Sequence, residues 1–119
     1  MTLVPAVDAD GNDRAGIRLP DIEVPLGTYA GWNLRAAAWG AEGMLTRWMG
    51  SYWPFAQTKA DRERAGDPRP SIEERYPTKA EYLARVRVAG RNLERQGFLL
   101  KEDADAILRR AEAADLWKN

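Results

Sequence analysis

The chain has 119 residues, of which 45% are hydrophobic and 30% charged, and its eighteen basic and eighteen acidic side chains cancel. This composition excludes wholesale disorder, and the lack of net charge leaves no field to attract nucleic acid, so we expect no nucleic-acid partner. The length suits a single domain over residues 1–119. Residues 1–57 form its β- and loop-rich, Trp-containing part, and residues 58–119 its helical part.

Histidine and cysteine are both absent from the sequence. Their absence removes the usual general base of serine-type hydrolysis, the thiol nucleophile and the side chains that most zinc sites use. We therefore assign no catalytic residue and expect no cofactor. No apolar run approaches the roughly 20 residues of a membrane-spanning helix, and the first residues lack the pattern of a secretory signal. The sequence thus favours a cytoplasmic location without a membrane partner.

The first predicted element is a β-hairpin. Residues 3–7 form a short apolar run, residues 8–12 tolerate turn geometry, and residues 15–19 resume the apolar pattern. A second extended piece is predicted at Ile22–Val24, because flanking prolines favour an edge strand or an extended tether. Leu26–Leu34 is a further candidate for an extended segment, although its two glycines leave this open.

The turn of the hairpin contains the only candidate metal ligands. Asp8, Asp10 and Asn12 fall at alternate positions, as the first three ligands of a calcium loop do. A calcium loop also needs glycine at the sixth position and glutamate at the twelfth, where this chain has Asp13 and Leu19. We therefore favour a simple turn over a calcium site.

Four helices are predicted in the second half, at residues 59–64, 72–76, 79–96 and 101–114. The first three each follow a Thr or Ser in the N-cap position, and the third carries apolar residues at spacings of three and four. Gly97 ends the third helix, so the last two should form an αα-hairpin. The resulting fold class is α+β, with an irregular β-hairpin and loop layer packed on a C-terminal helical layer.

Nucleophile and acid/base signatures are weak in this chain. Ser51 and Ser71 are the only serines, and neither lies in a G-x-S-x-G setting between strand and helix. Ser71 fits a helix cap better than a nucleophile. The paired carboxylates lie at predicted helix starts, where negative charge is favourable for structural reasons.

The segment from Gly27 to Arg35 is the candidate ligand contact. Its small residues allow close approach of the backbone, and its larger side chains supply flat apolar surface and hydrogen-bond donors. These larger side chains are Tyr29, Trp32, Asn33 and Arg35. The alternative, which we favour, is a tightly packed β-corner in which the side chains of Asn33 and Arg35 hydrogen-bond to neighbouring carbonyl groups.

Aromatic side chains crowd the next segment without a clean period, and we expect Trp39, Trp48, Trp53 and Phe55 to be covered. Each buried aromatic removes about 150 to 250 Å² from water, so a soluble monomer rarely exposes several together. The cover is either the helical hairpin of the same chain or the surface of another protein.

Several stretches also match a known family in their order along the chain: Val4–Arg35, Gly50–Thr58, Asp61–Tyr76, and Gly97–Leu100 followed by Glu102 and Asp103. Together they resemble the C-terminal region of the bacterial alpha/beta hydrolase domain-containing proteins. Members of that family resemble serine hydrolases of several hundred residues, with the nucleophile upstream of this region. No position here matches the nucleophile or the catalytic histidine.

The resemblance implies a non-catalytic C-terminal module that packs against a hydrolase core or against copies of itself. A small-molecule binding module, using the aromatic and arginine side chains of the first half, is the alternative from a different class. An enzyme that works with carboxylates alone is the least favoured interpretation.

Overall fold

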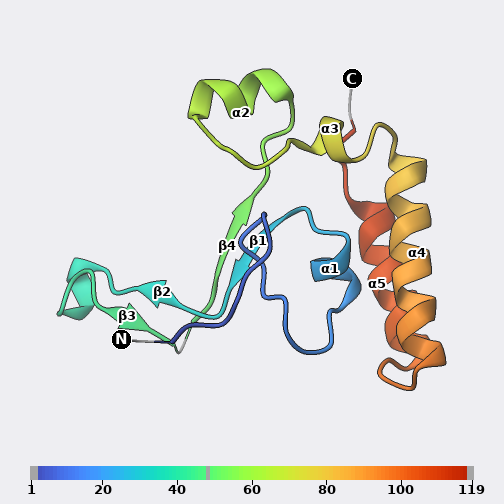
Figure 1. Cartoon of the computed structure of the whole chain (residues 1–119), viewed down its shortest axis with the longest axis horizontal. Coiled ribbons are helices and arrows are strands. Elements are labelled where there is room, and N and C mark those ends of the chain that lie inside the picture. Colours follow the sequence, from blue (N-terminus) through green and yellow to red (C-terminus); the bar gives the residue numbers. More distant parts are fainter. Residues whose placement is uncertain (1–2, 48, 118–119) are drawn as a thin grey trace.

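The computed structural model describes residues 3–47 and 49–117, and it has the α+β fold that the sequence predicts. Small antiparallel sheets occupy the first half, and helices occupy the second (Figure 1). The chain ends in the helical pair α4 (Lys79–Arg95) and α5 (Lys101–Ala113), which pack side by side.

The predicted N-terminal hairpin is reduced to a single antiparallel bridge between Val7 and Asp13. The turn between them closes as expected, because the Asp8 carboxylate accepts hydrogen bonds from the N–H groups of Asp10 and Asn12 at 2.9 and 3.0 Å. Beyond the bridge, the expected second strand over residues 15–19 is absent from the described structure. These side chains are mostly exposed, so they gain little from a paired strand.

The predicted extended piece at Ile22–Val24 is wrong, because the backbone forms the single helical turn α1 (Pro20–Glu23). Pro20 occupies the first helical position, where its fixed φ suits a helix and its missing N–H is not needed. The N–H groups of Ile22 and Glu23 both donate to the carbonyl of Leu19, which closes the turn.

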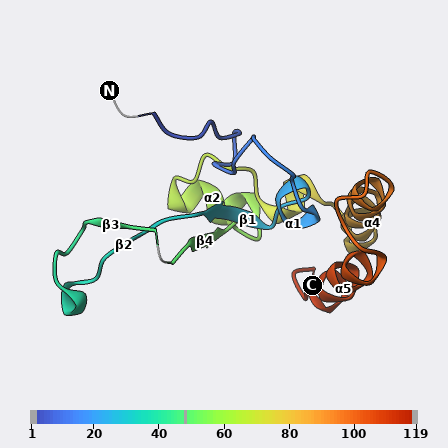
Figure 2. The same cartoon turned by 90° about the horizontal axis from the view of Figure 1, so that it is seen from below.

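The expected extended character of Leu26–Leu34 is confirmed by two strands. β1 (Gly27–Ala30) pairs with β4 (Ser51–Pro54), and β2 (Asn33–Leu34) pairs with β3 (Leu45–Thr46), both antiparallel. These ladders form one long hairpin with the short 3-10 helix η1 (Ala37–Trp39) near its far end. We call the described residues 31–47 and 49–50 the β arm. Figures 1 and 2 show it projecting from the side opposite the α4–α5 pair.

The predicted helices of the second half are confirmed to within about a residue. α2 (Lys59–Ala65) begins after Thr58, whose hydroxyl accepts from the Asp61 N–H, and ends at Gly66 with a φ of 67°. α3 (Ile72–Arg75) begins with the capping box that Ser71 and Glu74 predict. Thr78 caps α4 in the same manner as Thr58 caps α2.

The hydrophobic core joins the end of the β layer to the helices. Ile72, Tyr76 and Tyr82 meet residues from α4 and α5, and the indole N–H of Trp117 donates to the carbonyl of Tyr76 at 2.9 Å. Phe55 also belongs to this core and is only 4% exposed. The buried core residues are Val24, Phe55, Ile72, Tyr76, Tyr82, Val86, Ala89, Ile107 and Ala111.

The molecule is more open than its length requires. Its radius of gyration is 16.3 Å, whereas a compact domain of this size has about 13.5 Å. Its accessible surface is 8643 Å², against about 6,500 Å² for a compact monomer of 13.4 kDa. The chain therefore leaves roughly 2,000 Å² more surface accessible than a compact monomer of its mass.

Candidate functional site

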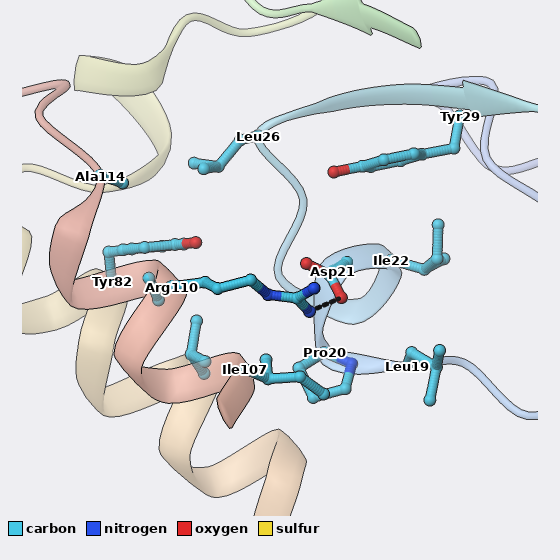
Figure 3. A pocket seen from close by; sticks show the side chains of 12 residues that line it. Leu19, Pro20, Asp21, Ile22, Leu26, Tyr29, Tyr82, Ile107, Arg110 and Ala114 are labelled. Carbon is cyan, nitrogen blue, oxygen red and sulfur yellow. Dashed lines mark ion pairs between the residues drawn. The ribbon is translucent and has the colours of Figure 1, made fainter. Parts of the chain in front are cut away.

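An open groove lies between α1 and the α4–α5 pair, with a volume of about 560 Å³ (Figure 3). α1 and the start of the β layer form one wall, and side chains of α4 and α5 form the other. Most of the lining is aliphatic or aromatic. The lining residues are Leu19, Pro20, Asp21, Ile22, Leu26, Tyr29, Tyr82, Val86, Ile107, Arg110, Ala111 and Ala114.

Two tyrosines bring hydroxyl groups to this groove. Tyr82 extends from α4 with its hydroxyl directed into the space between the walls, and Tyr29 extends from β1 above it (Figure 3). Burial raises the pKa of each hydroxyl to about 12. Both are therefore neutral near pH 7, and each retains a proton to donate.

One ion pair crosses the mouth of the groove. A guanidinium nitrogen of Arg110 on α5 lies 3.6 Å from a carboxylate oxygen of Asp21 on α1. Both side chains are substantially exposed, so the pair contributes little to stability. It nevertheless leaves the groove with one positive and one negative charge that balance.

The four residues predicted to contact a ligand do not gather at this groove. Among them, only Tyr29 lines it. Trp32 packs against Trp53, with ring centroids 5.8 Å apart. Arg35 donates to the carbonyl of Trp39 at 2.5 Å, whereas the Asn33 side chain accepts from the N–H of Leu34. The two latter contacts are local, as expected for a β-corner.

The β arm carries six large exposed hydrophobic side chains, among them the most exposed described tryptophan. Trp39 is 78% exposed at its far end, and Leu45, which pairs with Leu34, is 67% exposed. The arm is nevertheless ordered by backbone hydrogen bonds, including those that join Arg35 to Gly43 and Met44. Its described exposed hydrophobic residues are Trp32, Leu34, Trp39, Met44, Leu45 and Met49.

The predicted set of covered aromatics divides in two. The chain's own core covers Phe55, which is one of the two kinds of cover that the sequence left open. Trp39 and Trp53 remain partly or largely exposed. Trp48 lies outside the described residues.

Arginine side chains help to hold Phe55 in place. The guanidinium carbon of Arg75 lies 3.8 Å from the centroid of the Phe55 ring, and that of Arg69 lies 5.2 Å from it. Arg75 also pairs with Asp10, and Arg69 donates to the hydroxyl of Thr28 at 2.9 Å. The N-terminal turn, the β layer and α3 are thereby joined at one point.

The candidate calcium ligands each contact another part of the chain. Asp8 pairs with Arg18 at 2.9 Å, and the Arg18 guanidinium is among the causes that keep the pKa of Asp8 below its ordinary value, against the opposing effect of burial. Asp10 faces Arg75. Asn12 is fully buried, donates to the carbonyl of Gly27 at 3.1 Å and accepts from the N–H of Tyr29 at 2.7 Å. Within residues 3–47 and 49–117, no group of three or more acidic side chains is placed to hold a metal ion.

The comparison with protein families gives one match. The sequence model described as alpha/beta hydrolase domain matches residues 2–109. The chain belongs to this alpha/beta hydrolase domain family. Searches of curated proteins and of solved structures found no match.

Alpha/beta hydrolases use a serine on a strand-to-helix elbow, so the two serines of this chain are the first side chains to inspect. The Ser51 hydroxyl, on β4, donates to the carbonyl of Trp32 at 2.7 Å. The Ser71 hydroxyl is fully buried and bonded to the Glu74 carboxylate at 2.7 Å. Both hydroxyls therefore have structural partners. No described helix of this hydrolase-family chain is long and apolar enough to cross a membrane.

Sequence reasoning missed the groove. Its walls come from segments far apart in the chain, and Tyr82 lies among the apolar residues of α4, whose spacing predicts only a buried helix face. Arg110 lies in the last turn of α5, where a positive charge favours the helix dipole and predicts no ligand contact. Neither signal points to a shared site.

Proposed function

We propose that this chain is a non-catalytic, C-terminal module of an alpha/beta-hydrolase-like protein, and that its β arm docks on the hydrolase core. The observation that carries the proposal is the ordered arm, whose apolar side chains lie in solvent. Several large apolar side chains exposed on one ordered segment are typical of a surface that binds another molecule.

The surface area of the chain supports this role. A stable protein–protein interface buries about 1,200 to 2,000 Å² in total, half of it on each partner. The chain exposes roughly 2,000 Å² more than a compact monomer of its mass. The excess is therefore comparable with the area of a standard interface. Trp39 at the arm's far end is suited to anchor it, because Trp is enriched among the residues that dominate binding energy.

The chemistry of the chain supports a non-catalytic role. Its 119 residues contain no imidazole and no thiol. Its two serine hydroxyls are bonded to a carbonyl and to a carboxylate that caps a helix. A serine nucleophile needs a base within hydrogen-bond reach that accepts its proton during attack. Glu74 does not fit this role, because Arg62 and Ser71 hold its pKa well below the ordinary value.

The test is a binding titration against the catalytic core of a family member expressed without its own C-terminal region. Isothermal titration calorimetry should detect a complex with the full chain. The double variant Trp39→Ser/Leu45→Ser should weaken it at least about tenfold, as expected when an anchor residue is lost.

The matched control is Val88→Ser/Leu100→Ser, which removes two exposed apolar side chains outside the arm and should bind as the unmodified chain does. Equal affinity of the arm variant and the unmodified chain would overturn the docking role. If the core did not bind while light scattering showed a dimer of the chain alone, a second copy would be the occupant of the arm, and docking on a hydrolase core would be wrong.

A further inference from the structure

We propose that the groove between α1 and the α4–α5 pair binds a neutral, mainly apolar small molecule, and that the Tyr82 hydroxyl donates a hydrogen bond to a carbonyl-type oxygen of that molecule. This site shares no residue with the β arm and does not depend on the docking role.

The first support is an unused donor. Tyr82 is only 5% exposed, and its ring is fixed between Tyr76 and Trp117, with centroids 5.2 and 5.0 Å away. Among the described residues, none accepts a hydrogen bond from its hydroxyl. Every side-chain oxygen or nitrogen that is fully buried in that part of the chain has a hydrogen-bond partner. The unpartnered Tyr82 hydroxyl is therefore not fully buried. It is accessible from the groove, into which it points (Figure 3).

The second support is the shape and lining of the groove. A volume of about 560 Å³ falls in the range of about 300 to 1,000 Å³ that is typical of small-molecule sites. Leu26, Ile22 and Ile107 supply apolar walls on either side of the Tyr82 hydroxyl (Figure 3). An apolar surface around a few convergent polar groups is the usual composition of a ligand pocket.

The third support is the charge of the groove, which selects a neutral ligand. Arg110 and Asp21 face each other across the mouth at 3.6 Å, so they compensate one another. A carboxylate ligand that approached Arg110 would also meet the like charge of Asp21. An ammonium ligand that approached Asp21 would likewise meet the like charge of Arg110. A carbonyl oxygen can instead accept from Tyr82 without disturbing the pair.

Tyr82 also has the protonation state that this role requires. Burial raises the pKa of its hydroxyl to about 12, so the phenol stays protonated throughout the neutral range. Binding through this donor should therefore be independent of pH between about 6 and 9, where a group with that pKa does not titrate.

The test is a titration with 2-octanone, followed by amide chemical shifts of the isotopically labelled full chain. Resonances of α1, α4 and α5 at the groove should shift in a saturable manner. Tyr82→Phe retains the ring and removes the hydroxyl, and it should weaken the affinity about three- to tenfold, as for loss of one hydrogen bond. Val88→Ser changes an exposed side chain of α4 that does not line the groove, and it is the control, with unchanged affinity expected.

A blocking variant separates groove binding from adsorption elsewhere. Ala114 lies at the groove rim after α5, so Ala114→Trp should fill the space and abolish the saturable shifts while the rest of the spectrum stays folded. Octanoate, which has the same chain length and a negative charge, should bind more weakly than 2-octanone. The proposal is overturned if 2-octanone produces no saturable shifts at the groove, if Tyr82→Phe binds it unchanged, or if octanoate binds as well.

Discussion

The packed region around Phe55 and the β arm both carry large apolar side chains, but only the packed region buries them. Around Phe55 and Tyr76, apolar rings are buried and the charged groups beside them are paired. In the arm, Trp39 and Leu45 stand in solvent although the backbone beneath them is regularly hydrogen-bonded. Regular backbone hydrogen bonding in a segment is therefore not evidence that its side chains are packed.

Truncation of Phe55 should have the largest effect on the packed region. Phe55→Ala leaves a cavity and removes the ring under the Arg75 guanidinium, so we expect a loss of about 3–5 kcal/mol in the free energy of unfolding. Urea denaturation followed by circular dichroism measures it. Phe55→Leu, which conserves most of the volume, should lose much less, and equal losses for the two variants would contradict the packing role.

Removal of the Asn12 side chain should come next. Asn12→Ala leaves the Gly27 carbonyl and the Tyr29 N–H without their partner. Each unsatisfied group costs about 1–3 kcal/mol, so the two together should cost about 2–6 kcal/mol in chemical denaturation. Calcium added to the unmodified chain should not raise its unfolding midpoint. A calcium-dependent rise that Asn12→Ala removes would restore the metal site that the geometry argues against.

Two glycines of the long hairpin, one in β1 and one directly after it, provide a closely matched pair. A Cβ at Gly27 would lie 2.6 Å from the Trp53 carbonyl oxygen and 2.9 Å from the Pro54 Cα, whereas a Cβ at Gly31 would meet nothing within 4 Å. Gly27→Ala should therefore cost about 1–3 kcal/mol of stability, as overpacking does. Gly31→Ala should be close to neutral. Equal thermal midpoints for the two variants would show that β1 and β4 do not pack as described.

Glu74 gives the packed region an acid-sensitive contact. Hydrogen bonds from Arg62 and then from the Ser71 backbone and hydroxyl lower its pKa below the ordinary 4.5. Because the folded-state pKa is depressed, the stabilisation is complete above about pH 4.5 and declines as the pH falls toward the folded value. Glu74→Gln keeps the capping acceptor but should flatten the pH dependence of the urea midpoint below pH 5. An unchanged slope in the variant would exclude this contribution.

The smallest effect should come from the arm itself. Trp39→Ser removes a side chain that is 78% exposed, so the free energy of unfolding should change by no more than about 0.5 kcal/mol. Chemical denaturation of the isolated chain checks this value. A loss above about 2 kcal/mol would mean that Trp39 packs on its own chain, and the contrast between arm and core would then disappear.

The helices were the most predictable part of the fold, because their signals are local. Thr58, Ser71 and Thr78 cap the helices that they were expected to cap, since each bonds an N–H only three residues away. Pro20 was misinterpreted because proline suits both an extended piece and the first turn of a helix. The helical turn forms because the Leu19 carbonyl accepts hydrogen bonds from the N–H groups of Ile22 and Glu23.

The candidate site was far less predictable than the fold. Tyr29 was expected at a ligand contact and lines the groove, but its expected neighbours Trp32, Asn33 and Arg35 lie in the arm. These three residues lie away from the groove because they follow β1 into the second ladder of the long hairpin, which extends beyond the end of β1. Tyr82 and Arg110 enter the groove through the packing of α4 and α5, which no sequence spacing records.

By itself, the sequence determined the α+β composition, the helix boundaries, the family resemblance and the absence of imidazole and thiol groups, because these depend on residue identity or on contacts a few positions apart. Only the tertiary structure decided which aromatics are covered, how the N-terminal acids are paired and where a groove opens. These features join residues as distant as Asp10 and Arg75, or Asp21 and Arg110. Such long-range contacts follow from how the layers pack, and packing is settled by the whole chain at once.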